Sequence, residues 1–241
     1  MSGKIDVGIL GATGTVGQEF IAQLEDHPWF RVGWIGASER SATKQYRDAT
    51  PWRLPVTRPD RIADMTLERV TPGRAPELVF SGLAASVAGE VEVEFAEAGH
   101  VVVSNARNHR MDSLVPLVIP EINRDHLQLL PAQRVAKGWA GCIVTNPNCS
   151  TIIMLVPVTP LHRAVGVDRM VISTYQAASG AGAAAMIELE TQAREYVEGR
   201  KRLTTDIFGQ QYIFNVFSHD SDIGPDGYNT EETKMVNDVI E

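Results

Sequence analysis

The chain has 241 residues, of which 44% are hydrophobic, and its formal net charge is −8 at pH 7. This length and composition allow a sizeable core in one large or two small domains. The negative charge disfavours nucleic acid and anionic membranes as partners, because phosphate surfaces are bound by clustered Lys and Arg. No apolar run approaches the ~20 residues of a membrane span. The N-terminal segment reaches Asp6 and Gly8 too early for a signal peptide, so we expect a cytoplasmic protein.

The thiols and imidazoles limit the chemistry further. Two cysteines, Cys142 and Cys149, in a chain without a secretion signal do not predict a disulfide framework. The six histidines never occur at ligand spacing with one another or with a cysteine pair, so we expect no metal. One reactive thiol is the more useful hypothesis.

The first part of the chain alternates between short β-branched runs and helical segments. Buried strands are predicted over residues 5–10, 31–35, 78–80, 101–104 and 143–145. Helices are predicted between some of them, over 17–24 and 87–98. This alternation is typical of an α/β fold with a doubly wound, mostly parallel sheet. We expect residues 42–76 to be irregular, with at most one strand.

The pattern changes after residue 148, where we place a domain boundary. An apolar helical run is predicted over 152–161, a strand over 169–174, and a long helix over 183–198 that Gly199 ends. Residues 220–228 are predicted to form a loop. Asn229 or Thr230 then caps a final helix.

A glycine-rich turn, from Gly11 to Gly17, joins the first predicted strand to a helix. Glycines let backbone N–H groups approach a pyrophosphate, whose charge the helix N-terminus favours. The Gly-x-x-Gly-x-x-Gly spacing departs from the standard fingerprint, so a tight packing turn is the alternative. We interpret the segment as a Rossmann-like dinucleotide site with the candidate residues Gly11, Thr13, Gly14, Thr15, Val16 and Gly17.

The end of the second strand bears on the choice of cofactor. An NAD enzyme usually has an acidic residue there, which accepts from the ribose 2′-OH. Here Arg40 lies between Ser38 and Ser41, a combination that suits a 2′-phosphate, so we predict NADP. Glu39 argues against this unless it points to solvent, and a solvated turn is the alternative. Further cofactor candidates follow the next strands: Ser81 and Asn105.

The segment Thr145-Asn-Pro-Asn-Cys149-Ser-Thr places a thiol between a strand and a helix. A helix N-terminus lowers the pKa of a cysteine and favours the thiolate, which is the form a nucleophile needs. Buried cysteines are more often inert, and we expect that of Cys142, which lies inside a strand pattern. Cys149 is therefore the candidate nucleophile.

Seven segments along the chain carry a resemblance to a known family. They are GATGTVGQEF, GASERSATKQY, VFSGL, VVSNARNHRMDSLVPLVIPEIN, TNPNCST, TYQAASGAG and DGYNTEETKMVND. In this order they resemble the archaeal and fungal branch of aspartate-semialdehyde dehydrogenases over nearly the whole chain. The resemblance implies an NADP-binding Rossmann-like domain over 1–148 and an incomplete α+β catalytic and dimerisation domain over 149–241. It also implies a homodimer or homotetramer.

The implied reaction is the reduction of L-aspartyl 4-phosphate by NADPH to L-aspartate 4-semialdehyde and phosphate, in biosynthesis of Lys, Thr and Met. In the family a cysteine attacks the acyl phosphate, and hydride reduces the resulting thioester through a thiohemiacetal. Cys149 matches that cysteine, and Gln176 matches a glutamine that orients the substrate. Asn148 falls where the family stabilises the oxyanion, although a backbone N–H could serve equally.

The resemblance also assigns groups that hold the substrate. Arg110 matches an arginine that grips phosphate, which suits its bidentate fork. Glu231 and Lys234 match a pair that meets the substrate ammonium and the phosphate. From the residues alone, a solvated ion pair at this helical spacing is the better explanation of that pair. Two residues of the Gly/Ala-rich segment complete the cofactor candidates, Ser179 and Gly180.

Two family features have no counterpart here: a histidine in an Arg-x-Pro-Val-x-x-Gly-His motif and a late arginine for the substrate carboxylate. His219 lies in a Phe-Ser-His-Asp context that does not match. We therefore expect a C-terminally truncated, poorly active chain.

Three alternatives stay open. Archaeal-type malonyl-CoA reductase resembles this family and uses the same thiol chemistry. N-acetylglutamyl-phosphate reductase fits less well, because its nucleophile motif resembles Gly-Cys-Tyr-Pro. A non-catalytic nucleotide-binding module would keep the fold without a depressed thiol pKa.

Overall fold

The computed structural model describes residues 3–218 and 221–240. Its contacts divide the chain into two compact units, one ending at Pro160 and the other running from Leu161 to Ile240. The division falls inside helix α7, Cys149–Val165. Each unit is described by itself below, and the domain boundary at 148/149 stays a prediction.

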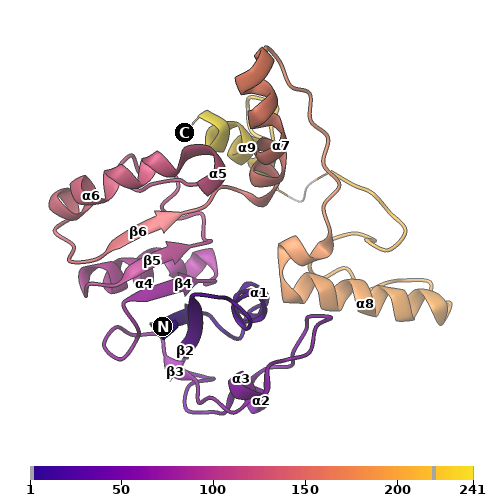
Figure 1. The fold of residues 1–241 in the computed structure, drawn as a ribbon. Coiled ribbons are helices and arrows are strands. Elements are labelled where there is room, and N and C mark those ends of the chain that lie inside the picture. Colours follow the sequence, from indigo (N-terminus) through magenta and orange to yellow (C-terminus); the bar gives the residue numbers. More distant parts are fainter. Residues whose placement is uncertain (1–2, 219–220, 241) are drawn as a thin grey trace. The chain divides into compact units, whose positions relative to one another are not determined.

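The first unit contains, within the described residues, a six-stranded sheet in the order β3-β2-β1-β4-β5-β6 (Figure 1). All neighbouring strands are parallel. The strands are β1 (Ile5–Leu10), β2 (Phe30–Ala37), β3 (Glu68–Arg69), β4 (Leu78–Ser81), β5 (Val101–Ser104) and β6 (Cys142–Thr145). The order reverses between β1 and β4, so the predicted doubly wound parallel sheet is confirmed.

Both faces of this sheet are buried. Side chains alternate along each strand, so neighbouring residues of one strand contribute to the cores on opposite faces. Ile9 of β1 packs in one apolar cluster with Ile21 of α1 (Thr15–Leu24). Leu10 belongs to a second cluster with Phe95 of α4 (Ala85–Glu97). The helices that cover the two faces explain why the strands are almost continuously apolar. Shorter helices of the unit are α2 (Tyr46–Ala49), α3 (Asp60–Ala63), α5 (Pro120–Asn123), η1 (Arg124–Leu129) and α6 (Leu130–Lys137).

The segment expected to be irregular, 42–76, contains α2, α3 and the two-residue strand β3. Side-chain hydrogen bonds tie it to the turn after β1. The buried Tyr46 hydroxyl donates to the carbonyl of Ala12 at 3.0 Å, and Thr50 Oγ1 donates to the carbonyl of Thr13 at 3.2 Å. Burial raises the pKa of Tyr46 far above its usual value, so the hydroxyl keeps its proton. This irregular segment therefore supports the glycine-rich turn.

Gln133 of α6 lies beside β6, the outermost strand of the sheet on this side. Its buried amide donates to the carbonyls of Ile143 and Leu114, each at 2.9 Å. Its Oε1 accepts from Ile143 N at 2.8 Å. Because β6 is the last strand, these bonds satisfy backbone groups that would otherwise be unpaired. The sequence pattern did not predict α6 or this contact.

The second unit is helical in the part that is described. It contains the end of α7, then η2 (Ala178–Ala181), α8 (Ala183–Val197) and α9 (Thr230–Ile240). The strand predicted over 169–174 is wrong: these residues have no strand structure, and Val171 is exposed. A β-branched run forms a strand only when a neighbour pairs with it, and no described segment of this unit does so.

The two helix ends predicted in this unit are confirmed. Gly199, which follows α8, has a φ of +73°, the left-handed conformation that ends helices. Asn229 caps α9, since its Oδ1 accepts from Glu232 N at 2.9 Å. The Glu232 carboxylate accepts in return from Asn229 N at 2.8 Å, which completes a capping box.

Two buried carboxylates on α8 hold the irregular segment that follows this helix in the chain. The Glu188 carboxylate accepts from the backbone of Ile207 and Phe208 at 2.6 and 3.1 Å. Glu195 accepts from Thr204 N at 2.7 Å, and these hydrogen bonds lower the pKa of its carboxyl group. Buried carboxylates thus replace strand pairing as the support for this segment. No helix among the described residues has the length and apolar character needed to cross a membrane.

Replacing Gln133 by leucine should lower the free energy of unfolding by about 3 kcal/mol or more, because three backbone groups lose their partner. The change leaves buried backbone groups of Ile143 and Leu114 unsatisfied, at about 1–3 kcal/mol for each group. Urea denaturation measures the loss. Gln128→Leu, at an exposed position of η1, is the control and should change little. Equal stability of both variants would contradict the role assigned to Gln133.

Candidate active site

The carboxyl ends of the parallel strands meet at one edge of the sheet in the first unit (Figure 1). The turns after four of the strands, β1, β4, β5 and β6, each donate a main-chain hydrogen bond to the end of a neighbouring strand. These bonds run from Gly11 to Gly36, from Gly82 to Leu10, from Asn105 to Ser81 and from Asn146 to Ser104. The structure therefore brings the predicted turns together along the edge where ligands bind in such sheets.

The glycine-rich turn is closely packed on its inner side. Gly11 has a φ of +77°, and a Cβ there would lie 2.9 Å from the carbonyl oxygen of Gly82. A Cβ on Gly17 would lie 2.3 Å from the carbonyl oxygen of Gly11, so no larger residue fits at that position. On the outer side, a Cβ on the exposed Gly14 would come no closer than 3.4 Å to its neighbours. The backbone is thus accessible at Gly14.

This turn fits an anionic ligand such as a pyrophosphate. Helix α1 begins at Thr15, and its N-cap, Gly14, has no side chain that could cap the helix. The buried Oγ1 of Thr15 has no hydrogen-bond partner in the described structure. An anion at the helix N-terminus would be stabilised by the helix dipole. Thr13 and Val16, the other candidates, are half-buried and exposed in the same turn.

The turn after β2 carries the two charged residues, Glu39 and Arg40, that bear on the choice between NADP and NAD. Ser38 and Arg40 are exposed, and Ser41 is buried. Glu39 points to solvent, with its side chain 82% exposed, and its Oε1 lies 3.3 Å from Arg69 Nη1. The acidic residue is therefore engaged with an arginine, which weakens the argument against a 2′-phosphate at this turn.

The thiol of Cys149 lies where the sequence predicted it. Strand β6 ends at Thr145, and Cys149 is the first residue of α7. It is exposed, whereas Cys142 is buried within β6. The N-terminal position in a 17-residue helix places the sulfur where the helix dipole favours negative charge. Exposure and helix position together suit a nucleophile.

Asn148 has a structural function that the sequence analysis missed. It is buried, and its Oδ1 accepts from Ser150 N at 2.9 Å, so it caps α7. The same oxygen lies 4.0 Å from Cys149 Sγ. Asparagine directly before a helix is a preferred N-cap, and that signal was present in the sequence. The amide nitrogen of Asn148 is the donor of this side chain, so it is the group that could bind an oxyanion.

Arg110 and Asn105 are linked to the segment that precedes Cys149. Arg110 is buried, and its Nη2 donates to the carbonyl of Asn105 at 3.1 Å. Asn146 Nδ2 donates to Asn105 Oδ1 at 3.3 Å. Asn105 therefore links the loop that carries Arg110, the candidate phosphate-binding residue, to the loop that carries Cys149.

Ser81 faces inward, toward a group that the sequence analysis did not single out. Its buried hydroxyl donates to Glu92 Oε1 at 2.6 Å, so only its backbone could face a ligand. Glu92 is fully buried in α4, and burial raises the pKa of its carboxyl group, against hydrogen bonds that lower it. A signal existed, because Glu92 lies on the apolar stripe of α4 with Ala88, Phe95 and Ala96.

The remaining candidates belong to the second unit. Gln176 is exposed, and its carbonyl accepts from the Tyr212 hydroxyl at 3.2 Å. Ser179 and Gly180 are exposed in η2. Lys234 Nζ lies 2.9 Å from the largely buried carboxylate of Glu231 on α9. The predicted pair is thus formed, while His219 lies outside the described residues.

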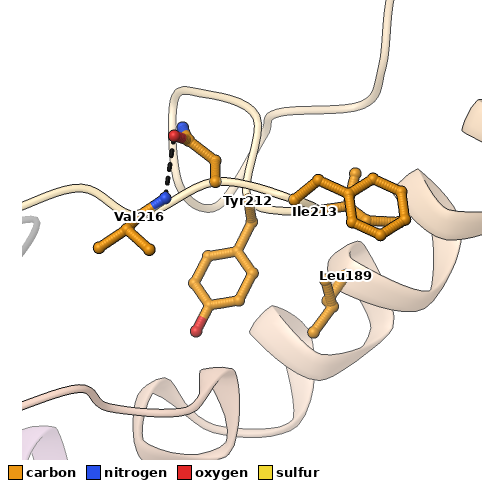
Figure 2. Close-up of a pocket in the computed structure, with 6 residues that line it drawn as sticks. Leu189, Tyr212, Ile213 and Val216 are labelled. Atoms are coloured by element: carbon orange, nitrogen blue, oxygen red, sulfur yellow. Dashed lines mark hydrogen bonds between the residues drawn. The ribbon is translucent and has the colours of Figure 1, made fainter.

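A groove in the second unit contains none of the predicted site residues. It lies between α8 and a neighbouring loop (Figure 2). Its lining consists of Leu189, Tyr212, Ile213, Phe214, Asn215 and Val216. That lining offers no thiol, carboxylate or imidazole, so it does not suit the expected chemistry. Across the described residues, no group of three or more His, Cys, Asp or Glu side chains could hold a metal ion.

Comparison with known proteins adds independent findings. Residues 6–130 match the family described as "Semialdehyde dehydrogenase, NAD binding domain". Residues 158–241 match "Semialdehyde dehydrogenase, dimerisation domain". The chain is 45% identical over 180 residues to aspartate-semialdehyde dehydrogenase of Archaeoglobus fulgidus, covering 74% of this chain and 52% of that protein. It is 48% identical over 180 residues to that of Schizosaccharomyces pombe, covering 73% and 50%.

Solved structures agree with these sequence matches. Aspartate semialdehyde dehydrogenase of Candida albicans with NADP has a TM-score of 0.63 at 42% identity, over 68% of this chain and 48% of that one. Aspartate semialdehyde dehydrogenase II of Vibrio cholerae complexed with ASA has a TM-score of 0.81 at 31% identity, over 99% and 66%. The chain spans about half the length of the curated relatives it matches. The chain therefore belongs to the semialdehyde dehydrogenase family, and the relatives that it resembles there are aspartate-semialdehyde dehydrogenases.

Proposed function

We propose that this chain binds NADP and supplies the nucleophile for reductive dephosphorylation of L-aspartyl 4-phosphate to L-aspartate 4-semialdehyde. The observation that carries the proposal is the exposed thiol of Cys149 at the N-terminus of α7. It lies at the same edge of the sheet as the glycine-rich turn. A nucleophile and a nucleotide site on one edge can act on one substrate.

The Cys149 thiolate attacks the acyl carbon of the substrate. A carbon–sulfur bond forms, the bond from carbon to the phosphate oxygen breaks, and phosphate leaves with the electron pair. The backbone N–H groups at the start of α7 and the amide nitrogen of Asn148 stabilise the oxyanion during this exchange. When bound, NADPH supplies the hydride that reduces the thioester. The thiohemiacetal anion on Cys149 then collapses: its carbon–sulfur bond breaks, the aldehyde leaves, and the sulfur keeps the electron pair as the thiolate.

Substrate binding is divided among charged side chains. Arg110 binds the phosphate group through its guanidinium fork. Glu231 and Lys234 meet the ammonium and phosphate groups, and their existing ion pair holds both side chains in place. Gln176 orients the substrate. The buried position of Glu231 supports this role, because a purely solvated ion pair would not bury its carboxylate.

The cofactor groups are assigned to the ends of four strands of the first unit, β1, β2, β4 and β5, and to one segment of the second unit. The turn from Gly11 to Gly17 holds the pyrophosphate, and the backbone at Ser81 and Asn105 borders the nicotinamide side. Ser38, Arg40 and Ser41 receive the 2′-phosphate. Ser179 and Gly180 complete the set. The match to a dimerisation domain supports assembly as a homodimer or homotetramer.

Incubation with aspartyl phosphate in the absence of reductant should acylate Cys149, because thioester formation needs no hydride. Intact mass spectrometry should detect one aspartyl adduct, and peptide mapping should place it on Cys149. The adduct should disappear in Cys149→Ser and persist in Cys142→Ser, whose thiol is buried. Acylation by malonyl-CoA in place of aspartyl phosphate would favour the related reductase. Failure of both reagents would identify a binding module.

Gly14→Ala should weaken NADP binding about tenfold or more while leaving the fold intact. The added methyl group has room in the protein itself but occupies the outer side of the turn where the pyrophosphate approaches. Isothermal titration calorimetry measures the affinity, and thermal denaturation checks the fold. Gly3→Ala is the control, because Gly3 precedes β1 at the opposite edge and a Cβ added there would meet no atom within 4 Å. Unchanged affinity in Gly14→Ala would remove the turn from the cofactor site.

Arg40→Ala should reduce the preference for NADP over NAD about tenfold, because one charge-assisted hydrogen bond to the 2′-phosphate is lost. The ratio of the two dissociation constants reports the change. Arg31→Ala, at the start of β2, serves as the control because it pairs with Asp6 at the opposite edge of the sheet. If both variants keep the same ratio, the 2′-phosphate is bound elsewhere.

A further inference from the structure

Glu92 joins the ends of two neighbouring strands through one oxygen atom. Its Oε1 accepts from the hydroxyl of Ser81 at 2.6 Å and from that of Ser104 at 2.7 Å. These serines are the last residues of β4 and β5 and face each other in register. Glu92 and both serines are fully buried, so water does not compete for these bonds. The carboxyl group therefore fixes the point from which the loop after β5 begins.

The second carboxyl oxygen of Glu92 faces His109. Glu92 Oε2 lies 3.7 Å from His109 Nε2, and neither atom has a hydrogen-bond partner in the described structure. Buried polar atoms in native proteins almost always find partners, so each of these two is the natural partner of the other. A small movement would close the pair to a hydrogen bond.

Both ends of the loop between Ser104 and Arg110 thus depend on Glu92. At the start, the Ser104 oxygen that donates to Glu92 also accepts from Ala106 N at 3.0 Å. At the end, His109 directly precedes Arg110, whose Nη2 reaches back to the carbonyl of Asn105 at 3.1 Å. The guanidinium is therefore held by a loop whose two ends converge on one buried carboxyl group.

We propose that Glu92 is a positioning residue that, through Ser104 and His109, holds Arg110 in the orientation that binds phosphate. This inference rests on the phosphate-binding role proposed above for Arg110. Glu92 itself touches no substrate, because it is buried beneath the strand ends.

The chemistry of the pair favours a neutral carboxyl group. Burial raises the pKa of Glu92, against the hydrogen bonds from Ser81 and Ser104 and the interaction with His109. A neutral acid can accept from both serines through Oε1 and donate from Oε2 to His109 Nε2. Asp112 also lies near His109, and it pairs with Lys137 at 2.7 Å. Glutamine can form the same bonds as the neutral acid, which provides a conservative variant.

The experiment measures the dissociation constant of inorganic phosphate by calorimetry in the presence of NADP. Glu92→Leu and His109→Ala should each weaken phosphate binding about tenfold, the order expected when one charge-assisted hydrogen bond is lost. Glu92→Gln should stay within about twofold of the unmodified chain. NADP affinity should be unchanged in Glu92→Gln, which can keep the bonds to Ser81 and Ser104. Glu94→Leu, at an exposed position of the same helix, is the matched control.

A double-mutant cycle with Arg110→Ala separates positioning from a general loss of structure. In the Arg110→Ala background, Glu92→Leu and His109→Ala should cause no further loss of phosphate affinity. Equal losses in both backgrounds would overturn the inference, as would full phosphate affinity in Glu92→Leu or His109→Ala with Arg110 present. If Glu92→Leu does not fold, His109→Ala alone decides between these outcomes. If Arg110→Ala keeps normal phosphate affinity, the proposed role of Arg110 itself fails.

The pH dependence of stability gives a separate readout. Because the pKa of Glu92 is higher in the folded than in the unfolded chain, the native protein retains a proton that the unfolded chain releases above its ordinary pKa of 4.5. The free energy of unfolding should therefore fall as pH rises from that value through the raised pKa. Glu92→Gln has no such group and should show a flatter profile over the same range. Parallel profiles would contradict the neutral state of Glu92.

Discussion

Parallel pairing of the strands is the constraint on which the candidate site depends. Because every neighbouring pair from β3 to β6 is parallel, all the strands end at one edge, although they are distant in sequence. The turns then bond to one another along that edge, as Gly82 does to Leu10 and Asn105 to Ser81. The close contact of Gly17 with Gly11 allows α1 to begin directly above this edge. The topology of the sheet therefore places the thiol of Cys149 and the glycine-rich turn at the same edge.

The parts of the fold that follow from apolar periodicity could be predicted from sequence. Strands such as β1 and helices such as α1 match their predictions to within a few residues, since burial on both faces leaves a strong pattern. Helix α6 was missed because its amphipathic pattern is short and its key buried residue, Gln133, is polar. The strand expected over 169–174 failed for a different reason, since pairing depends on a partner that local sequence does not reveal.

The site shows the same division between local and non-local information. Cys149 was predicted at a helix N-terminus because a strand, an Asn-Pro turn and an apolar run are local features. The contacts of Glu92 with Ser81 and Ser104 are not local, because they join α4 to two separate strands. An isolated acidic residue in an apolar stripe was the available sign, and its partners appear only once the sheet is assembled.

The amide of Gln133 has a consequence beyond stability. An outermost strand with unpaired N–H and C=O groups is a template onto which a strand from another molecule can add. By bonding both the N–H and the carbonyl of Ile143, Gln133 gives β6 the hydrogen-bonding equivalent of one more strand residue. Together with the backbone bonds of Thr145 to Pro116 and Val118, this side chain therefore discourages edge-to-edge aggregation of the sheet, in a protein whose edge strand is too apolar to rely on charge for that purpose.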